Sequence, residues 1–334
     1  MSNTVLITGA AGWLGGLLAE ALVADPKTPN VRLILADIVE PKSPKSTKAV
    51  TIKADLTAKG PIDALFKTEF GIPDTIYCLH GIMSRGSEDN FDLGLKVNID
   101  SIRLMLQAAR EFGAQSPIKF IFTSSLAVYG GPLPHTVTPD TIATPEGAYG
   151  TGKLTSELLV NEYSRRGFID GRIIRLPTIV VRPGAPSAAT SAFISGVIRE
   201  PLKGIECLCP IGDSIDSPEL ELPSWVASPE TTIKNFVVAK HIPAAKFLSH
   251  TRVVCLPGFT ATVREELQAL EKVGGKKALD LVTFKDDPIN RRIVSSWPPR
   301  FDNSYPLSLG FVVDEGGMEP IVRQFQKDIE AGIA

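Results

Sequence analysis

The sequence Val5-Leu6-Ile7-Thr8-Gly9-Ala10-Ala11-Gly12-Trp13-Leu14-Gly15 decides the fold. It begins with an apolar run, ends in three glycines spaced three apart, and continues into leucines and alanines at helical spacing through residue 24. This pattern predicts a buried strand that turns sharply into a helix. A chain places glycines at such a turn where backbone atoms must approach one another, or a ligand, without an intervening Cβ.

The same alternation of apolar strand and helix continues along the first half of the chain. Strands without polar alternation that are separated by helices predict a parallel sheet covered on both faces, which is the doubly wound, Rossmann-type α/β fold. The later predicted strands are Val31–Ala36, Ala49–Lys53, Asp74–Leu79, Ile118–Ser124 and Arg172–Leu176, and the predicted helices are Pro61–Phe70, Leu93–Phe112 and Glu146–Arg166.

The pattern changes after Pro177, where prolines and glycines become frequent. Lys240–Leu248 is helix-like and Arg252–Leu256 is strand-like, so this part of the chain is expected to return to the sheet. We therefore expect two units: a sheet domain of residues 1–180 with 235–257, and a smaller, irregular α/β lobe of residues 181–234 and 258–334.

The composition excludes several classes of protein. The chain has 334 residues and a formal net charge of −2, without the clustered basic residues of a nucleic-acid-binding surface. Its four cysteines are too few for a disulfide framework, and Cys207-Leu-Cys209 lacks both a nearby histidine and the spacing of a zinc site. We find no apolar run that would span a membrane and no secretory leader. We expect a cytoplasmic protein with no metal and no membrane partner.

The spacing of the glycines indicates a dinucleotide-binding turn. Gly9 permits the tight turn, Gly12 lets backbone N–H groups reach a phosphate, and Gly15 lets the helix pack against the strand. The helix N-terminus then presents unpaired N–H donors and the positive end of its dipole to a pyrophosphate. Trp13 and Leu14, in the same turn, are also expected to contact the cofactor.

Acidic residues follow the next two strands. Asp37 ends the second one, where a carboxylate accepts hydrogen bonds from the adenosine ribose and repels a 2′-phosphate. This favours NAD over NADP as the cofactor, although a strand-end turn residue is the alternative reading of Asp37. Asp55 and Leu56 follow the third strand, where a contact with adenine is expected.

A tyrosine and a lysine open the second long helix. Tyr149 and Lys153 are four residues apart, so their side chains share one face of the helix. A nearby ammonium lowers the pKa of a phenol, and we expect Tyr149 to exchange a proton with a substrate hydroxyl or carbonyl. The alternative for an isolated pair at this spacing is an exposed helix contact. Here the pair follows the serine-rich end of the fifth strand, where a doubly wound sheet places its ligands.

Three segments resemble signatures of the extended short-chain dehydrogenase/reductase family: TGAAGWLG at residues 8–15, SSLAVYG at residues 124–130, and the Tyr149-x-x-x-Lys153 pair. In that family the catalytic serine stands four residues before the tyrosine of the V-Y-G segment, which implies Ser125. Asn98 matches the helix asparagine beside the cofactor. The resemblance implies a homodimer and further NAD contacts at Leu79, Gly81, Thr123, Leu176, Pro177 and Thr178.

Longer segments are similar to the D-erythronate dehydrogenase branch of that family, including YSRRGFID at residues 163–170 and RLPTIVVRPG at residues 175–184. The branch implies NAD-dependent oxidation of a four-carbon sugar acid at its secondary alcohol. Thr178 stands where nucleotide-sugar epimerases of the family carry an asparagine, which argues against an epimerase for UDP-sugars. His80 replaces a smaller residue, and it is either catalytic or, as we favour, a packing or hydrogen-bonding residue.

The substrate carboxylate is expected to bind an arginine, because the planar guanidinium matches its geometry. Arg182 is the best-placed candidate, and Ser84 and Thr178 are expected to bind substrate hydroxyls beside Ser125 and Tyr149. A broad carbonyl reductase and a sugar epimerase remain alternatives with the same residues. A non-catalytic NAD-binding sensor is the alternative from another class.

Overall fold

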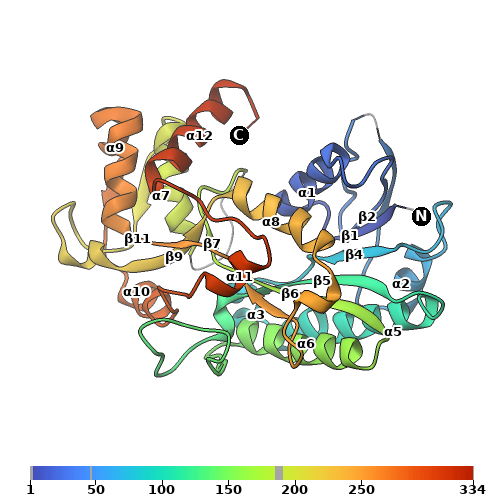
Figure 1. Ribbon diagram of the computed structural model, residues 1–334. Coiled ribbons are helices and arrows are strands. Elements are labelled where there is room, and N and C mark those ends of the chain that lie inside the picture. The colour runs from blue at the N-terminus through green and yellow to red at the C-terminus, as the bar shows by residue number, and fades with distance from the viewer. Residues whose placement is uncertain (1–2, 46, 185–190, 334) are drawn as a thin grey trace.

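A seven-stranded parallel sheet forms the centre of the N-terminal half of the molecule (Figure 1). The computed structural model describes residues 3–45, 47–184 and 191–333. The strand order is β10-β6-β5-β4-β1-β2-β3, and every neighbouring pair is parallel. The strands are β1 (Thr4–Thr8), β2 (Arg32–Asp37), β3 (Lys48–Lys53), β4 (Thr75–Cys78), β5 (Ile118–Ser125), β6 (Ile169–Leu176) and β10 (Val253–Cys255). The predicted fold class is confirmed.

Helices cover both faces of this sheet because alternate residues of each central strand point to opposite sides. Leu6 of β1 belongs to the core beneath α2, α5 and α6, whereas Val5 and Ile7 belong to the core beneath α1 and α8. Figure 1 shows these two helical layers above and below the strands. The helices are α1 (Trp13–Ala24), α2 (Lys59–Leu65), α3 (Ser84–Asp89), α4 (Phe91–Leu95), α5 (Ser101–Phe112), α6 (Ala148–Arg165) and α8 (Pro229–His241).

The helix predicted over Leu93–Phe112 is divided. A π-helical turn, Lys96–Asp100, separates α4 from α5. The side chain of Asn98, buried inside this turn, accepts a hydrogen bond from the backbone N–H of Ile82 at 3.0 Å and donates to the carbonyl oxygen of Ile82 at 3.0 Å. The widened turn therefore holds an asparagine against the loop after β4, an arrangement often found at functional sites.

The helix predicted over Lys240–Leu248 is wrong. Helix α8 begins earlier, at Pro229, where the Ser228 hydroxyl caps it by accepting from the N–H of Thr231 at 3.0 Å. It ends at His241, and Pro243 follows, which lacks the N–H needed to continue a helix. Residues Ala244–Lys246 form only a single 3-10 turn. The Ser-Pro start signal was present in the sequence and was overlooked.

A second lobe packs beside the carboxyl ends of the sheet strands. It has its own apolar core, to which α7, α9 and α12 contribute Val197, Leu270 and Val322, each fully buried. Two small sheets belong to it, with orders β11-β9-β7 and β12-β8. Its elements are β7 (Thr178–Ile179), α7 (Ala192–Leu202), β8 (Cys207–Cys209), β9 (Pro223–Ala227), β11 (Phe259–Thr262), α9 (Val263–Leu279), β12 (Val282–Phe284), α10 (Pro288–Ser295), α11 (Ser304–Ser308) and α12 (Met318–Glu330). Within the described ranges, no helix has both the length and the apolar character to cross a membrane.

Candidate active site

The glycine turn after β1 is too crowded for side chains at two of its three glycines. Gly9 has a φ of +73°, and a Cβ there would lie 2.8 Å from the backbone nitrogen of His80. A Cβ on Gly15 would lie 2.5 Å from the carbonyl oxygen of Gly9. Gly12 is the N-cap residue of α1 and, having no side chain, leaves the N–H groups of the first turn without a capping hydrogen bond. The three glycines thus let β1, the turn and α1 approach one another as closely as backbone atoms allow.

The first turn of α1 fits an anion. Its N-cap residue, Gly12, offers no side-chain acceptor, and its first turn carries no acidic residue, so neither competes with an anion for the N–H groups at the start of the helix. Trp13 and Leu14, both half-buried, begin the helix, and Leu14 packs against the core beneath α1. This cradle fits the pyrophosphate of a dinucleotide, since the helix dipole and the N–H donors both favour negative charge.

Asp37 lies at the end of β2, beside the glycine turn. Its carboxylate accepts from the N–H of Ala11 at 3.0 Å and from the N–H of Ile38 at 2.6 Å. Asp55 is exposed and accepts from both the N–H and the hydroxyl of Thr57, which lowers the pKa of its carboxyl. The carboxylate of Asp37 is therefore fixed next to the turn, whereas that of Asp55 is tied to its own loop.

The loop after β4 meets the buried ends of two side chains. Gly81 has no room for a Cβ, which would lie 2.9 Å from Oδ1 of Asn98 and 3.3 Å from Nζ of Lys153. Leu79 continues the strand pairing by donating its N–H to the carbonyl oxygen of Thr8 at 3.2 Å. On the neighbouring strand, the Thr123 hydroxyl is buried and has no protein partner among the described residues. An unpaired buried hydroxyl beside this crowded loop fits a polar group of a bound cofactor.

His80, in the same loop, is not free for catalysis. Nδ1 lies 2.7 Å from the hydroxyl of Thr8, and Nε2 lies 2.8 Å from the hydroxyl of Ser101. Burial, with a smaller contribution from the Lys153 charge, lowers the pKa of the imidazole to about 3. The ring is therefore neutral and bridges β1 to α5, which agrees with the hydrogen-bonding role favoured from the sequence.

Ser125, Tyr149 and Lys153 converge at the carboxyl end of β5. Ser125 is the last residue of β5, and Tyr149 and Lys153 lie in the first two turns of α6. Nζ of Lys153 donates to the backbone carbonyl of Thr123 at 2.8 Å and lies 5.7 Å from the centre of the Tyr149 ring. The lysine side chain is buried, with 3% of its surface exposed. The three side chains thus occupy one site, with the lysine below the tyrosine.

The pKa of Tyr149 differs from the sequence expectation. Burial raises the pKa of the phenol to about 12, while a hydrogen bond with Ser125 and the charge of Arg182 oppose this rise. Nζ of the lysine lies over the face of the ring, 5.7 Å from its centre, and burial lowers the pKa of its ammonium to about 8. In the protein alone the phenol is therefore protonated at neutral pH. The expectation that the Lys153 ammonium lowers the pKa of this phenol, with a nicotinamide ring adding to the effect, is not met in the protein alone.

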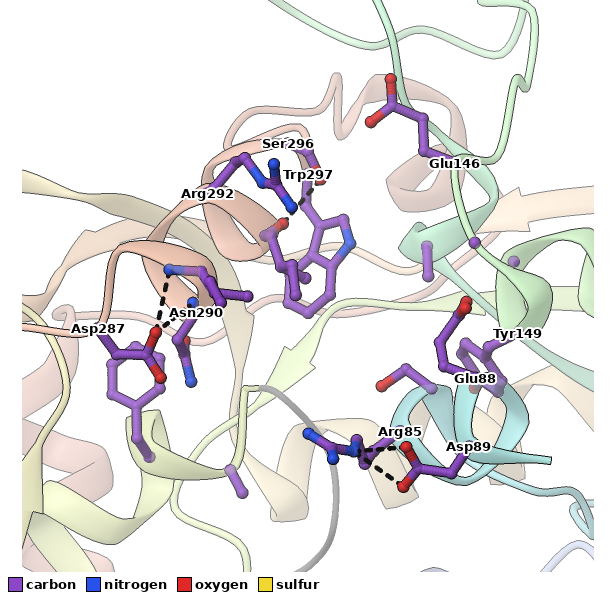
Figure 2. A pocket seen from close by; sticks show the side chains of 18 of the residues that line it. Arg85, Glu88, Asp89, Glu146, Tyr149, Asp287, Asn290, Arg292, Ser296 and Trp297 are labelled. Carbon is purple, nitrogen blue, oxygen red and sulfur yellow. Dashed lines mark hydrogen bonds and ion pairs between the residues drawn. The ribbon is translucent and has the colours of Figure 1, made fainter. Parts of the chain in front are cut away.

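A cavity of about 940 Å³ opens in front of Tyr149, between the two lobes (Figure 2). This volume is at the upper end of the range for small-molecule sites. Tyr149, Ser84 and Glu88 line it from the sheet side, and Asn290 and Trp297 line it from α10 and the residues after it. Figure 2 shows Arg85 turned toward Asp89, with which it forms an ion pair at 2.8 Å, and Arg292 on the opposite wall.

The other residues expected at the site lie at its border. Leu176 ends β6, Pro177 is buried, and Thr178 begins β7, where it is 8% exposed. Arg182 follows β7, its backbone held by the Ser195 hydroxyl at 3.2 Å and by Nη1 of Arg199 at 3.0 Å. Thr178 and Arg182 are not among the described residues that line the cavity. Arg182 is nevertheless close enough to Tyr149 for each side chain to influence the pKa of the other.

Sequence reasoning missed several residues of the site. Glu88 accepts from the N–H of Ala148 at 2.7 Å, at the start of α6, and no motif pointed to it. Trp297 lies on the far wall and comes from the irregular lobe, where no periodic pattern indicated contacts. Glu157 lies one helical turn beyond Lys153 and is buried, with 2% exposed, so its spacing did carry a signal. No group of three or more His, Cys, Asp or Glu side chains in the described ranges is arranged to hold a metal ion.

Comparisons with known proteins agree with this architecture. Residues 5–212 match the NAD dependent epimerase/dehydratase family. The chain is 40% identical over 323 residues to a D-erythronate dehydrogenase of Haemophilus influenzae, which covers 96% of this chain and 98% of that one. It is 38% identical over 338 residues to a D-erythronate dehydrogenase of Cupriavidus necator, covering 99% of both.

A solved structure extends the comparison to three dimensions. The crystal structure of a nucleoside-diphosphate-sugar epimerase from Agrobacterium tumefaciens superposes with a TM-score of 0.89 and 35% sequence identity, over 100% of this chain and 96% of that one. The family match and the two relatives named D-erythronate dehydrogenase indicate an oxidoreductase that uses NAD. The resemblance stated from the sequence is confirmed, and the chain belongs to the NAD dependent epimerase/dehydratase family.

Proposed function

We propose that the protein oxidises the secondary alcohol of a small sugar acid, such as D-erythronate, through a Ser125-Tyr149-Lys153 site. The observation that carries the proposal is the convergence of three side chains at the cavity: Tyr149 lines it, Ser125 lies close enough to influence the pKa of its phenol, and the buried ammonium of Lys153 lies 5.7 Å from the centre of its ring. The two relatives named D-erythronate dehydrogenase, at 40% and 38% identity, support the substrate class.

The residues that would hold NAD follow from the geometry. The turn from Gly9 to Gly15 would hold the pyrophosphate, and Asp37 would accept from the adenosine ribose. Gly81, Asn98, Thr123 and Lys153 surround the place for the nicotinamide ribose. NAD supplies the hydride acceptor for the carbon of the substrate alcohol when it is bound.

The side chains of the protein accept the proton of the substrate alcohol. The Ser125 and Tyr149 hydroxyls hold the alcohol oxygen, and the oxygen of Tyr149, once ionised, accepts the alcohol proton. Because burial raises the pKa of this phenol to about 12, ionisation requires positive charge nearby. Among the described residues, Lys153 and Arg182 are cations that lie close enough to contribute.

Arg182 is proposed to bind the substrate carboxylate. In the described part of the chain no carboxylate pairs with its guanidinium, and its backbone is held from both sides by α7. The guanidinium lies near the Tyr149 hydroxyl, so a carboxylate bound there would place the neighbouring alcohol carbon at the site. Ser84, which lines the cavity, and Thr178, at the start of β7, are proposed to bind substrate hydroxyls.

The test is the Tyr149→Phe variant, assayed with NAD and a panel of four-carbon sugar acids by the absorbance of the reduced cofactor. Turnover should fall by about 100- to 10,000-fold, because the proton acceptor is lost. The Kd for NAD, measured by calorimetry, should remain within about twofold of the wild-type value, since the phenyl ring is retained. A variant that keeps the wild-type turnover number would refute the role of Tyr149.

An epimerase is the second candidate, because the solved structure with a TM-score of 0.89 is that of a nucleoside-diphosphate-sugar epimerase. An epimerase would convert a sugar nucleotide without net formation of reduced cofactor. Net reduction of NAD by sugar acids, and none of this epimerisation, is the expected result. A broad carbonyl reductase would instead run faster from ketone and NADH, which the same panel measures in reverse.

We also propose a homodimer that forms through α5 and α6. Leu158 on α6 is 64% exposed, on a helix whose opposite face is buried against the sheet, and a second copy of the chain would cover it. Size-exclusion chromatography with light scattering is expected to give twice the chain mass of 35.9 kDa.

A further inference from the structure

A buried polar cluster lies directly beneath the proposed catalytic residues. It consists of Ser124 on β5, Glu157 on α6, Arg175 on β6, and Tyr129, which follows β5. Each of the first three side chains is less than 10% exposed. Ser124 and Arg175 are direct neighbours in the β5–β6 register, so the sheet presents both to the same helix.

Glu157 is the centre of this cluster. Its Oε1 accepts from the Ser124 hydroxyl at 2.5 Å and from Nε of Arg175 at 2.8 Å, and its Oε2 accepts from Nη2 of Arg175 at 2.5 Å. This two-point contact fixes the orientation of the carboxylate more firmly than a single bond would. Arg175 continues to the pocket wall, where Nη1 donates to the hydroxyl of Tyr129 at 2.6 Å.

The cluster joins α6 to the end of β5 at two consecutive residues. Lys153 donates to the carbonyl oxygen of Thr123 at 2.8 Å, and Glu157, one helical turn later, accepts from Ser124. The next residue of the strand is Ser125. Two adjacent contacts between helix and strand therefore determine how far Ser125 lies from Tyr149, because both side chains depend on the relative position of β5 and α6.

We propose that Glu157 is a positioning residue, which acts through Arg175 and Ser124 to hold Lys153 and Ser125 in place against Tyr149. The inference rests on the proposed function of that site. Glu157 touches neither the cavity nor the reacting atoms, and it acts in two ways. It orders the strand end mechanically, and it places a negative charge one turn from the Lys153 ammonium.

The second effect has a defined sign. Burial lowers the pKa of Lys153 to about 8, while the neighbouring Cys78 and Glu157 oppose this change. The titratable groups around Nζ are Cys78 on β4, His80 after it, and Tyr149 and Glu157 on α6. Because the imidazole is neutral and burial raises the pKa of the Cys78 thiol to about 12, Glu157 supplies the negative charge among these groups. Without it, Lys153 would lose its proton at a lower pH.

The test is the isosteric variant Glu157→Gln. We expect kcat to fall by about 10- to 100-fold, with KM much less affected, because the reacting groups lose alignment rather than substrate contacts. The alkaline limb of the pH profile should move down by about one pH unit. The titration of Lys153, followed by NMR of lysine labelled with 13C at Cε across the same pH range, should show the same shift without any substrate. An unchanged kcat together with an unshifted Lys153 titration would overturn the proposal.

Asp170→Asn is the matched control. Asp170 forms an ion pair at 2.8 Å with Arg172, which is buried on the same strand as Arg175. The Asp170→Asn substitution removes the carboxylate that pairs with a buried arginine, as Glu157→Gln does. Asp170, however, lies near the start of β6, whereas Arg175 lies near its carboxyl end, beside the proposed site. We expect a comparable loss of stability, with kcat and the Lys153 titration unchanged.

Two further variants keep the test decisive if Glu157→Gln fails to fold. The double variant Glu157→Gln, Arg175→Met removes both charges of the pair, which proteins tolerate far better than the loss of one. Ser124→Ala removes one hydrogen bond and no charge, so it should lower kcat and leave the Lys153 titration unshifted. Wild-type kcat in both variants would refute the proposal. A wild-type enzyme with no turnover of sugar acids would instead refute the proposed function, while the NMR titration of Lys153 would still report on Glu157.

Discussion

Replacement of Gly15 by alanine tests the crowding of the glycine turn, and Gly16→Ala is its control. Both residues lie in the first turns of α1, so both substitutions gain about 0.8–1.0 kcal/mol of intrinsic helix stability. A Cβ at Gly16 meets no atom within 4 Å. A Cβ at Gly15 lies 2.5 Å from the carbonyl oxygen of Gly9 and 2.7 Å from Cα of Ala10, both of them backbone atoms.

These contacts set the expected energies. Backbone atoms cannot rotate aside as a flexible side chain would, so α1 must move away from the turn, and overpacking of this kind costs about 1–3 kcal/mol. We expect Gly16→Ala to raise the free energy of unfolding by up to about 1 kcal/mol. Gly15→Ala should lower it by up to about 2 kcal/mol after the helical gain is subtracted.

The assay is urea unfolding of the two variants, combined with NAD binding measured by calorimetry. Displacement of α1 moves the N–H donors that face the pyrophosphate, so Gly15→Ala should weaken NAD binding by about tenfold or more, equivalent to about 1.4 kcal/mol. Gly16→Ala should bind NAD as the wild type does. Equal stability and equal NAD affinity in the two variants would refute both the crowding argument and the placement of the pyrophosphate on this turn.

Two further predictions concern carboxylates. Glu266 on α9 is fully buried, and burial, together with the nearby charge of Glu265, raises its pKa well above the usual 4.5, so the folded protein loses stability as the pH rises above that value. In urea unfolding, the free energy of unfolding of Glu266→Gln should therefore match that of the wild type near pH 4 and exceed it by about 1–3 kcal/mol at pH 8. Glu271→Gln, at an exposed position of the same helix, should show no such gain. Parallel curves of unfolding free energy against pH for the wild type and Glu266→Gln would contradict this. Asp37→Ser should improve NADP binding by about tenfold and weaken NAD binding, because the carboxylate beside the turn no longer repels a 2′-phosphate; an unchanged NAD to NADP affinity ratio would show that Asp37 does not face the ribose.

The fold was predictable because its signals are local and repeated. The strands β1 and β2 at the centre of the pattern are apolar runs bounded by polar or glycine residues, and alternate residues contact different helical layers, as Leu6 and Ile7 do. The predicted helix boundaries were wrong where a single side chain or a single N-cap residue changes where a helix begins or how its turns are wound. Asn98 widens a helical turn through contacts with the loop at Ile82, which lies 16 residues away and has no periodic signal. Ser228 begins α8 earlier than the apolar pattern alone indicated.

The site was predictable only in part, for a physical reason. Tyr149 and Lys153 share a helix face, so spacing alone places them together. The protonation of Tyr149 depends on burial and on Arg182, which approaches from another lobe, and neither is visible in a four-residue spacing. The far wall of the cavity comes from α10 and Trp297, in a part of the chain whose irregular turns are held by contacts distant in sequence.

The division of the cavity between two lobes affects how enzymes of this kind can diverge. The wall that bears Tyr149 belongs to the sheet with the glycine turn, whereas Phe193, Asn290 and Trp297 come from the other lobe. Mutations that reshape the second wall leave the coenzyme cradle and the proton-transfer groups intact. Evolution can therefore exchange one substrate for another through a few substitutions on α7 and α10, and the same helices are the natural targets for redesigning which molecule the enzyme accepts.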